Sequence, residues 1–280
     1  MKLAFSTLGC PDWSFETIVE KARSFGFRAV EIRGIQKELD TGRLTCFLPD
    51  RQADTERLLR KNGVSVCGVG TSCAFHDASQ FPRALAEGKA AVDVCARMGI
   101  PFIRVFGNQI PREEEKGKTI RRVALGIEEL CAYAERTSSV QVLLEVHGDF
   151  NTVERLAEVA ELLRGHGSFG ILWDIEHSYR ARPGSEKLFY RSLKPLIRHV
   201  HVKDCRRENG TYSPCLPGEG EIPIGSIVRM LLDGGYGGYF SFEWEKRWNP
   251  KLPEPEVAFP RFVEEMHTIV YKGQNTERNG

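Results

Sequence analysis

Residues 141–147 of this 280-residue chain read QVLLEVH, a short apolar run that ends with an acid, Glu145, and a histidine, His147. Nearly continuous apolarity of this length is typical of a β-strand covered on both faces, as in a parallel sheet. Further runs of this kind occur at residues 2–7, 29–33, 64–70, 102–107, 170–175, 197–203 and 239–244. Together they predict eight strands.

Between these runs, apolar residues return with the period of an α-helix. Phe15, Ile18, Ala22 and Phe25 share one face of a predicted helix over residues 15–25. The same pattern is found at 51–61, 83–98, 118–136, 152–164, 186–194, 223–233 and 254–271. Eight strand–helix units predict an α/β chain folded as a single (β/α)8 TIM barrel over residues 1–272, with a polar tail at 273–280. No GxGxxG follows the first strand, which disfavours an open dinucleotide-binding sheet.

Composition excludes several classes of function. Lys plus Arg total 39 and Asp plus Glu total 38, so the net charge of +1 gives no drive toward nucleic acid or an anionic membrane. No stretch approaches the roughly 18 apolar residues of a membrane helix. The eight cysteines form no CxxC pair and several lie in apolar runs. We therefore expect reduced thiols and a cytoplasmic protein.

Four predicted strands, the fifth to the eighth, end in residues that can bind a metal: Glu145, Asp174, His201 and Glu243. Burying a carboxylate costs free energy unless the group is paired, hydrogen-bonded or bound to a metal. In a TIM barrel the carboxyl ends of the strands form the active site, so adjacent strands bring these groups to one point. Three carboxylates and one imidazole suit one divalent ion, with Mn²⁺, Mg²⁺, Co²⁺ or Fe²⁺ favoured and zinc also able to bind.

Such an ion polarises a sugar carbonyl and acidifies the neighbouring C–H bond. Glu145 and Glu243 come from opposite sides of the cluster, so one can remove a proton while the other returns it on the opposite face. Glu31 also ends a strand, but it lies across the barrel, and we expect it to hydrogen-bond to a ligand instead of binding the ion. Residues 205–222 form a long segment above the site and are a candidate lid.

The motifs LLEVHGD (143–149), LWDIEH (172–177), HVHVKD (199–204) and GEGEIP (218–223) resemble those of the xylose isomerase-like TIM barrels, the sugar phosphate isomerase/epimerase superfamily. The similarity covers essentially the whole chain. In ketose 3-epimerases of this family, the resemblance implies Glu145, Asp174, His201 and Glu243 as metal ligands. It further implies Glu145 and Glu243 as the acid/base pair.

The resemblance also implies that His177 and Arg207 contact substrate oxygens. His76, Lys203 and Trp13 follow predicted strands, and we expect them to contact substrate as well. The predicted function is a metal-dependent isomerase or epimerase that acts on a sugar or keto-polyol through an enediolate. Family members often pair, so the resemblance is compatible with a homodimer, while the sequence leaves the oligomeric state open.

Two alternatives stay open. Asn151 stands where ketose 3-epimerases commonly carry a further Glu, and the family also includes dehydratases and keto-sugar lyases that use the same metal site. An abasic-site endonuclease is less favoured, because that class needs several zinc ions, additional histidines and a basic groove. This chain has seven histidines and a net charge of +1.

Overall fold

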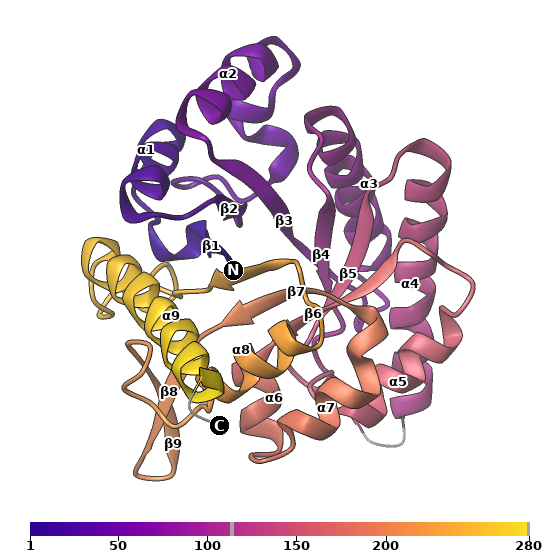
Figure 1. The fold of residues 1–280 in the computed structure, drawn as a ribbon. Helices are drawn as coiled ribbons and strands as arrows, with labels where there is room; N and C mark the ends of the chain where they lie inside the picture. Colours follow the sequence, from indigo (N-terminus) through magenta and orange to yellow (C-terminus); the bar gives the residue numbers. More distant parts are fainter. Residues whose placement is uncertain (113–114, 279–280) are drawn as a thin grey trace.

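In the computed structural model, which describes residues 1–112 and 115–278, parallel strands close into a barrel surrounded by helices (Figure 1). The barrel strands are β1 (Lys2–Ser6), β2 (Ala29–Ile32), β3 (Ser65–Ala74), β4 (Phe102–Phe106), β5 (Gln141–Glu145), β6 (Phe169–Asp174), β7 (Ile197–Val202) and β10 (Tyr239–Phe242). The helices are α1 (Phe15–Phe25), α2 (Gln52–Asn62), α3 (Phe81–Met98), α4 (Lys116–Thr137), α5 (Val153–Leu162), α6 (Ile175–Ala181), α7 (Glu186–Leu193), α8 (Ile224–Asp233) and α9 (Pro255–Arg278). The predicted TIM barrel is confirmed.

The barrel closes between the first and last strands. Ala4 of β1 lies opposite Ser241 of β10 on one side and opposite Ala29 of β2 on the other. Every neighbouring pair around the ring is parallel, so all the strand carboxyl ends lie on the same rim. Residues predicted to end different strands therefore meet at one mouth.

Local sequence signals fix the ends of several helices. The Oγ atom of Ser14 accepts a hydrogen bond of 3.2 Å from the Thr17 amide and caps α1. Gly26 ends the same helix with a φ of 89°, a conformation that glycine adopts without steric cost. These caps set the bounds of α1, which connects β1 to β2 along the chain.

Residues 205–222, expected as a long loop, include part of a β-hairpin. Strands β8 (Asp204–Glu208) and β9 (Thr211–Cys215) pair antiparallel, and the hairpin projects from the barrel (Figure 1). Asn209 and Gly210 form the turn with φ angles of 51° and 83°. An Asn-Gly pair is the strongest short signal for a two-residue hairpin turn, so this element was readable from the sequence.

The base of this hairpin is fixed by the carboxylate of Asp204. Oδ1 accepts hydrogen bonds from the amides of Cys205 and Ile222, and Oδ2 accepts them from Gly218 and Gly220. A side chain at position 220 would lie 2.1 Å from Oδ1, so glycine is required for this close approach. The segment expected to act as a lid is thus tied to the end of β7 at its root.

Two further boundaries differ from the sequence expectation. Strand β3 extends to Ala74, four residues beyond the predicted end, which brings His76 close to the strand. Helix α9 continues to Arg278, so the backbone at 273–278 is helical where a tail was expected, and residues 279–280 lie outside the described part.

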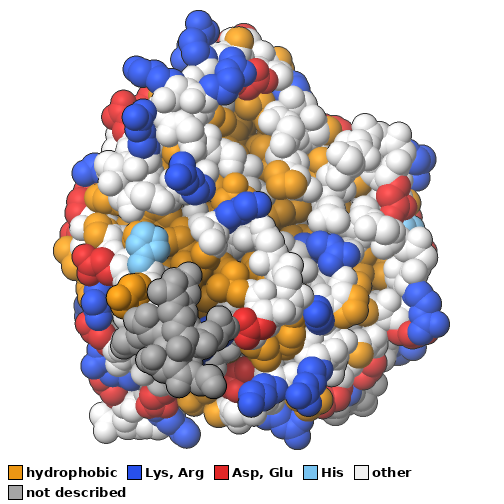
Figure 2. Space-filling model, viewed as in Figure 1, with side chains coloured by type: hydrophobic (Ala, Val, Ile, Leu, Met, Phe, Trp, Pro, Cys, Tyr) orange, Lys and Arg blue, Asp and Glu red, His pale blue; other side chains and the backbone are white. Residues whose placement is uncertain are grey.

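Within the described residues, no helix is both long enough and apolar enough to span a membrane. All eight cysteines, each within that described part, are free thiols. On the face seen in Figure 2, Lys and Arg side chains are interspersed with Asp and Glu around the periphery. That face therefore has the mixed charge expected from the near balance of the composition.

Candidate metal centre

Successive residues of a strand alternate in direction, so each barrel strand places inward-facing side chains at several depths. On β7, His199 lies in a deeper layer against Phe102, and His201 lies nearer the carboxyl end. The strand register sets His201 opposite Asp174 of β6. Glu145 ends β5, and Glu243 follows the end of β10 by one residue.

The structure brings these four predicted residues together. One donor atom from each of Glu145, Asp174, His201 and Glu243 lies within 4.8 Å of the other three. The Nδ1 atom of His201 is 3.3 Å from Glu145 Oε1, 3.4 Å from Glu243 Oε2 and 3.8 Å from Asp174 Oδ2. All four residues are buried, and Nδ1 has no hydrogen-bond partner. One free imidazole nitrogen and three carboxylates that face it form a donor set that fits one divalent cation.

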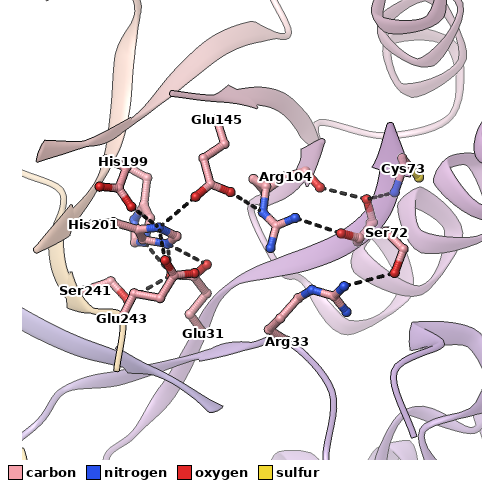
Figure 3. A network of polar contacts seen from close by, with 12 residues as sticks. Glu31, Arg33, Ser72, Cys73, Arg104, Glu145, His199, His201, Ser241 and Glu243 are labelled. Carbon is pink, nitrogen blue, oxygen red and sulfur yellow. Dashed lines mark hydrogen bonds and ion pairs between the residues drawn. The ribbon is translucent and has the colours of Figure 1, made fainter. Parts of the chain in front are cut away.

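Glu31 fixes the orientation of the imidazole (Figure 3). Both of its carboxylate oxygens lie 2.9 Å from His201 Nε2, and Oε2 also accepts a hydrogen bond of 2.8 Å from Ser241 Oγ. His199 Nε2 lies 2.9 Å from the same oxygen. Glu31 therefore occupies Nε2 and directs Nδ1 toward the carboxylates. This confirms the expectation that Glu31 hydrogen-bonds to a proposed ligand.

Arg104 is a residue of this site that the sequence analysis missed. It lies inside β4 with 1% of its surface exposed, and its Nε atom is 2.8 Å from Glu145 Oε2. Its Nη1 atom donates a hydrogen bond of 2.7 Å to the Thr71 carbonyl. Burial alone would raise the pKa of Glu145, but the charge of Arg104 together with the charge and hydrogen bond of His201 lowers this pKa. An arginine within the apolar run FIRVFG was the signal in the sequence.

Lys203, predicted to contact substrate, lies against two of the proposed ligands. Its Nζ atom is 2.9 Å from Asp174 Oδ2, 2.6 Å from Glu243 Oε2 and 2.8 Å from Glu245 Oε1. Burial works to raise the pKa of Glu243, but the charges of His201 and Lys203 hold this pKa below its usual range. The ammonium group thus forms ion pairs with carboxylate oxygens that would bind the ion.

Comparison with known proteins identifies the family of this chain. Residues 19–262 match the family described as xylose isomerase-like TIM barrel. This chain belongs to that family. An inosose dehydratase of Yersinia enterocolitica is 28% identical over 244 residues, which cover 74% of this chain and 79% of that protein. A fructoselysine 3-epimerase of Shigella flexneri is 24% identical over 260 residues, which cover 87% and 90%.

A solved structure with a bound zinc atom, the IOLI protein, shares the fold of this xylose isomerase-like barrel. The two superpose with a TM-score of 0.78 at 19% identity, covering 97% of this chain and 99% of that one. The named sequence relatives are thus a dehydratase and an epimerase that act on sugars or sugar-like compounds.

Two histidines of this family member lie beside the candidate metal centre. The His177 amide donates a hydrogen bond of 3.1 Å to Asp174 Oδ1 at the start of α6. The rings of His177 and His147 meet edge to face at 4.4 Å, and His147 also packs against Phe106 at 4.8 Å. Burial lowers the pKa of His177 to about 4, so its ring is neutral at pH 7. His177 therefore lies next to a proposed ligand, and its contact with substrate stays a prediction.

The other predicted substrate contacts lie in different surroundings. Trp13 packs against Phe25 of α1 and Phe259 of α9, with the Lys21 ammonium 5.7 Å from its ring. Its described ring contacts are thus with outer helices, and the structure does not bring it to the four proposed ligands.

Arg207 and His76 belong to the segments after β7 and β3. Arg207 is exposed on β8, where its guanidinium lies 5.7 Å from the Tyr212 ring. His76 is partly buried, its carbonyl accepts a hydrogen bond from Arg122, and its Nδ1 atom has no partner. Their contact with substrate stays a prediction.

Proposed function

We propose that this chain is a divalent-metal-dependent enzyme that isomerises or epimerises a ketose or keto-polyol through an enediolate. The observation that supports this is the convergence of four buried donors, Glu145, Asp174, His201 and Glu243, at the mouth of the barrel. The named relatives act on substrates of this kind, and one of them is an epimerase. We further propose Mn²⁺, Mg²⁺ or Co²⁺ as the ion because the donors are mostly oxygen, with zinc as the alternative.

Once held by these four residues, the ion would act as a Lewis acid toward the substrate carbonyl. Glu145 ends β5 and Glu243 directly follows β10, on either side of β6 and β7, so their carboxylates approach the centre from two directions. One would take the proton from the carbon beside the carbonyl, and the other would return a proton to the opposite face. Arg104 holds Glu145 in the ionised form that accepts a proton.

A dehydratase on the same site is the second candidate, and the position of Lys203 favours it. Its ammonium lies 2.6 Å from Glu243 Oε2, where it can donate a proton to the hydroxyl on the carbon β to the carbonyl, which leaves as water when a glutamate removes the α proton. The inosose dehydratase relative supports the same reading. The two reactions share proton removal by a glutamate, and they differ in whether water is lost.

The test is a screen of free ketoses, inososes and 3-keto-glycosides in D₂O with added Mn²⁺, Mg²⁺ or Co²⁺, followed by proton NMR. Exchange of a C–H for deuterium without loss of water supports the isomerase or epimerase, whereas loss of water, measured by mass spectrometry, indicates the dehydratase. Glu145→Gln and Glu243→Gln should abolish exchange. The matched control is Glu161→Gln on α5, where the side chain is 61% exposed, and it should exchange at the wild-type rate. Wild-type exchange in either glutamine variant would refute the assignment.

A further inference from the structure

Buried charged side chains in the described part of the chain have partners, with one exception. Arg104 pairs with Glu145, Lys203 with Asp174 and Glu243, Lys246 with Glu254, Glu176 with Arg180, and Glu31 with two histidines. Asp204 has four amide donors. Arg33 is 7% exposed, and within these residues no carboxylate lies within 4.0 Å of it. An unpaired buried cation is costly, so Arg33 needs a physical explanation.

Arg33 lies at the mouth of the barrel, next to the metal centre. It follows β2 and is two residues beyond Glu31, so the alternation of the strand places both side chains on the inner side, with Arg33 nearer the rim. Its amide donates a hydrogen bond of 2.8 Å to Thr7 Oγ1, which continues the direction of the strand. Figure 3 shows its guanidinium on the same side of the centre as that of Arg104.

The guanidinium of Arg33 is only partly used. Nη2 donates a hydrogen bond of 2.9 Å to Ser72 Oγ, and Nη1 is buried with no partner. A Cβ atom at Gly70 would lie 2.6 Å from Arg104 Nη2 and 2.8 Å from Arg33 Cδ, so a glycine here leaves the space that both arginines occupy. Burial and the nearby Arg104 charge lower the pKa of Arg33 to about 10, which leaves it cationic at neutral pH.

We propose that Arg33 binds an oxyanion, a carboxylate or a phosphate, carried by the substrate of the metal centre. The planar guanidinium matches both groups, and the free Nη1 and the Ser72-bound Nη2 form one edge of it. The substrate is then an acidic sugar or keto-polyol, held by Arg33 at the anionic end while its carbonyl end faces Glu145 and Glu243. This inference rests on the proposed function, since it assigns the class of substrate to the same site.

Three polyols that differ at one end test this: D-glucitol, D-gluconate and D-glucitol 6-phosphate. Each is titrated calorimetrically into the Mn²⁺-loaded full chain and into its Arg33→Met variant. We expect wild type to bind at least one anion about 10-fold more tightly than glucitol, as loss of a charge-assisted contact implies, and Arg33→Met to lose that preference. A preference for gluconate alone identifies a carboxylate, and a preference for the phosphate alone identifies a phosphate ester.

Two further variants keep this test decisive. Arg33→Lys keeps the charge without the planar geometry, so part of the preference should survive. Arg229→Met, at an exposed position on α8, should match wild type. Absence of any anion preference in wild type, or an undiminished preference in Arg33→Met, would overturn the proposal. Mn²⁺ titration by electron paramagnetic resonance separates failure of the proposed function from failure of the Arg33 proposal. Absence of metal binding in wild type contradicts the proposed function. Metal binding without any anion preference contradicts the role of Arg33 alone.

Discussion

The carboxylate of Glu31 holds His201 from below, with both oxygens 2.9 Å from Nε2, and this leaves Nδ1 facing Glu145, Asp174 and Glu243. A partner on the distant nitrogen of an imidazole sets both the tautomer and the direction of the lone pair. Glu31 therefore contributes to metal binding without touching the ion.

Replacing Glu31 by Gln should weaken Mn²⁺ binding by about 10- to 100-fold, the usual effect of losing such a partner. Electron paramagnetic resonance titration measures the free ion directly. Ser241→Ala, which removes only the hydrogen bond to Glu31 Oε2, should have a smaller effect. Equal affinity in Glu31→Gln and wild type would show that His201 is oriented by other contacts.

Replacing Arg104 by Met should raise the pKa of Glu145, because the cation 2.8 Å from Oε2 is, with His201, one of the two groups that lower it against burial. Glu145 would then be protonated at higher pH, so the acidic limb of the deuterium-exchange profile should move to higher pH. Arg104→Lys, which keeps the charge, should move it less. An unmoved limb in a folded Arg104→Met variant contradicts the role given to Arg104.

Lys203 should weaken metal binding, whereas Glu31 should strengthen it. Its ammonium touches Asp174 Oδ2 and Glu243 Oε2, so it repels an incoming cation and competes for the same oxygens. Lys203→Met should therefore bind Mn²⁺ roughly 10-fold more tightly, since like charges this close repel strongly in a buried site. The chelator-treated variant should be less stable than chelator-treated wild type, because two buried carboxylates lose their counter-ion. Unchanged or weaker Mn²⁺ binding would refute this account.

The pH dependence of stability should report on His177. Burial lowers its pKa to about 4, below the ordinary value of 6.5, so between these values the unfolded chain binds a proton that the native chain does not. The free energy of unfolding of chelator-treated protein should therefore fall as pH falls from 6.5 toward 4. Over this range the free energy of unfolding of His177→Gln should fall by about 1 to 2 kcal/mol less than that of wild type, as measured by urea unfolding. The control His267→Gln, at an exposed position, should follow wild type.

The barrel and the convergence of its four donors were predictable from sequence because both depend on local patterns. Each strand is a separate apolar run, and Glu145, Asp174, His201 and Glu243 each end or follow one. Closure of a parallel barrel then places the ends on a single rim, whatever the details of packing.

The arginines could not be placed in the same way, since their roles depend on groups far apart in sequence. The burial of Arg104 is understood only from its ion pair with Glu145 on the next strand. Arg33 is notable only because no such acid pairs with it among the described residues. Trp13 shows the same limit: it follows the first strand, yet its ring packs between α1 and α9. The hairpin after β7, by contrast, was not predicted, although the Asn209-Gly210 pair is a sequence signal for a two-residue hairpin turn.

Glu31 is synthesised before all four proposed donors, and Glu243 is synthesised last among them. Because β10 is also the strand that joins β7 to β1, the full coordination set and the sealed ring arise in the same event. A nascent or truncated chain that stops before this strand has three donors and an open edge. Retention of the proposed ion would thus report that β10 has taken its place and that the barrel is closed.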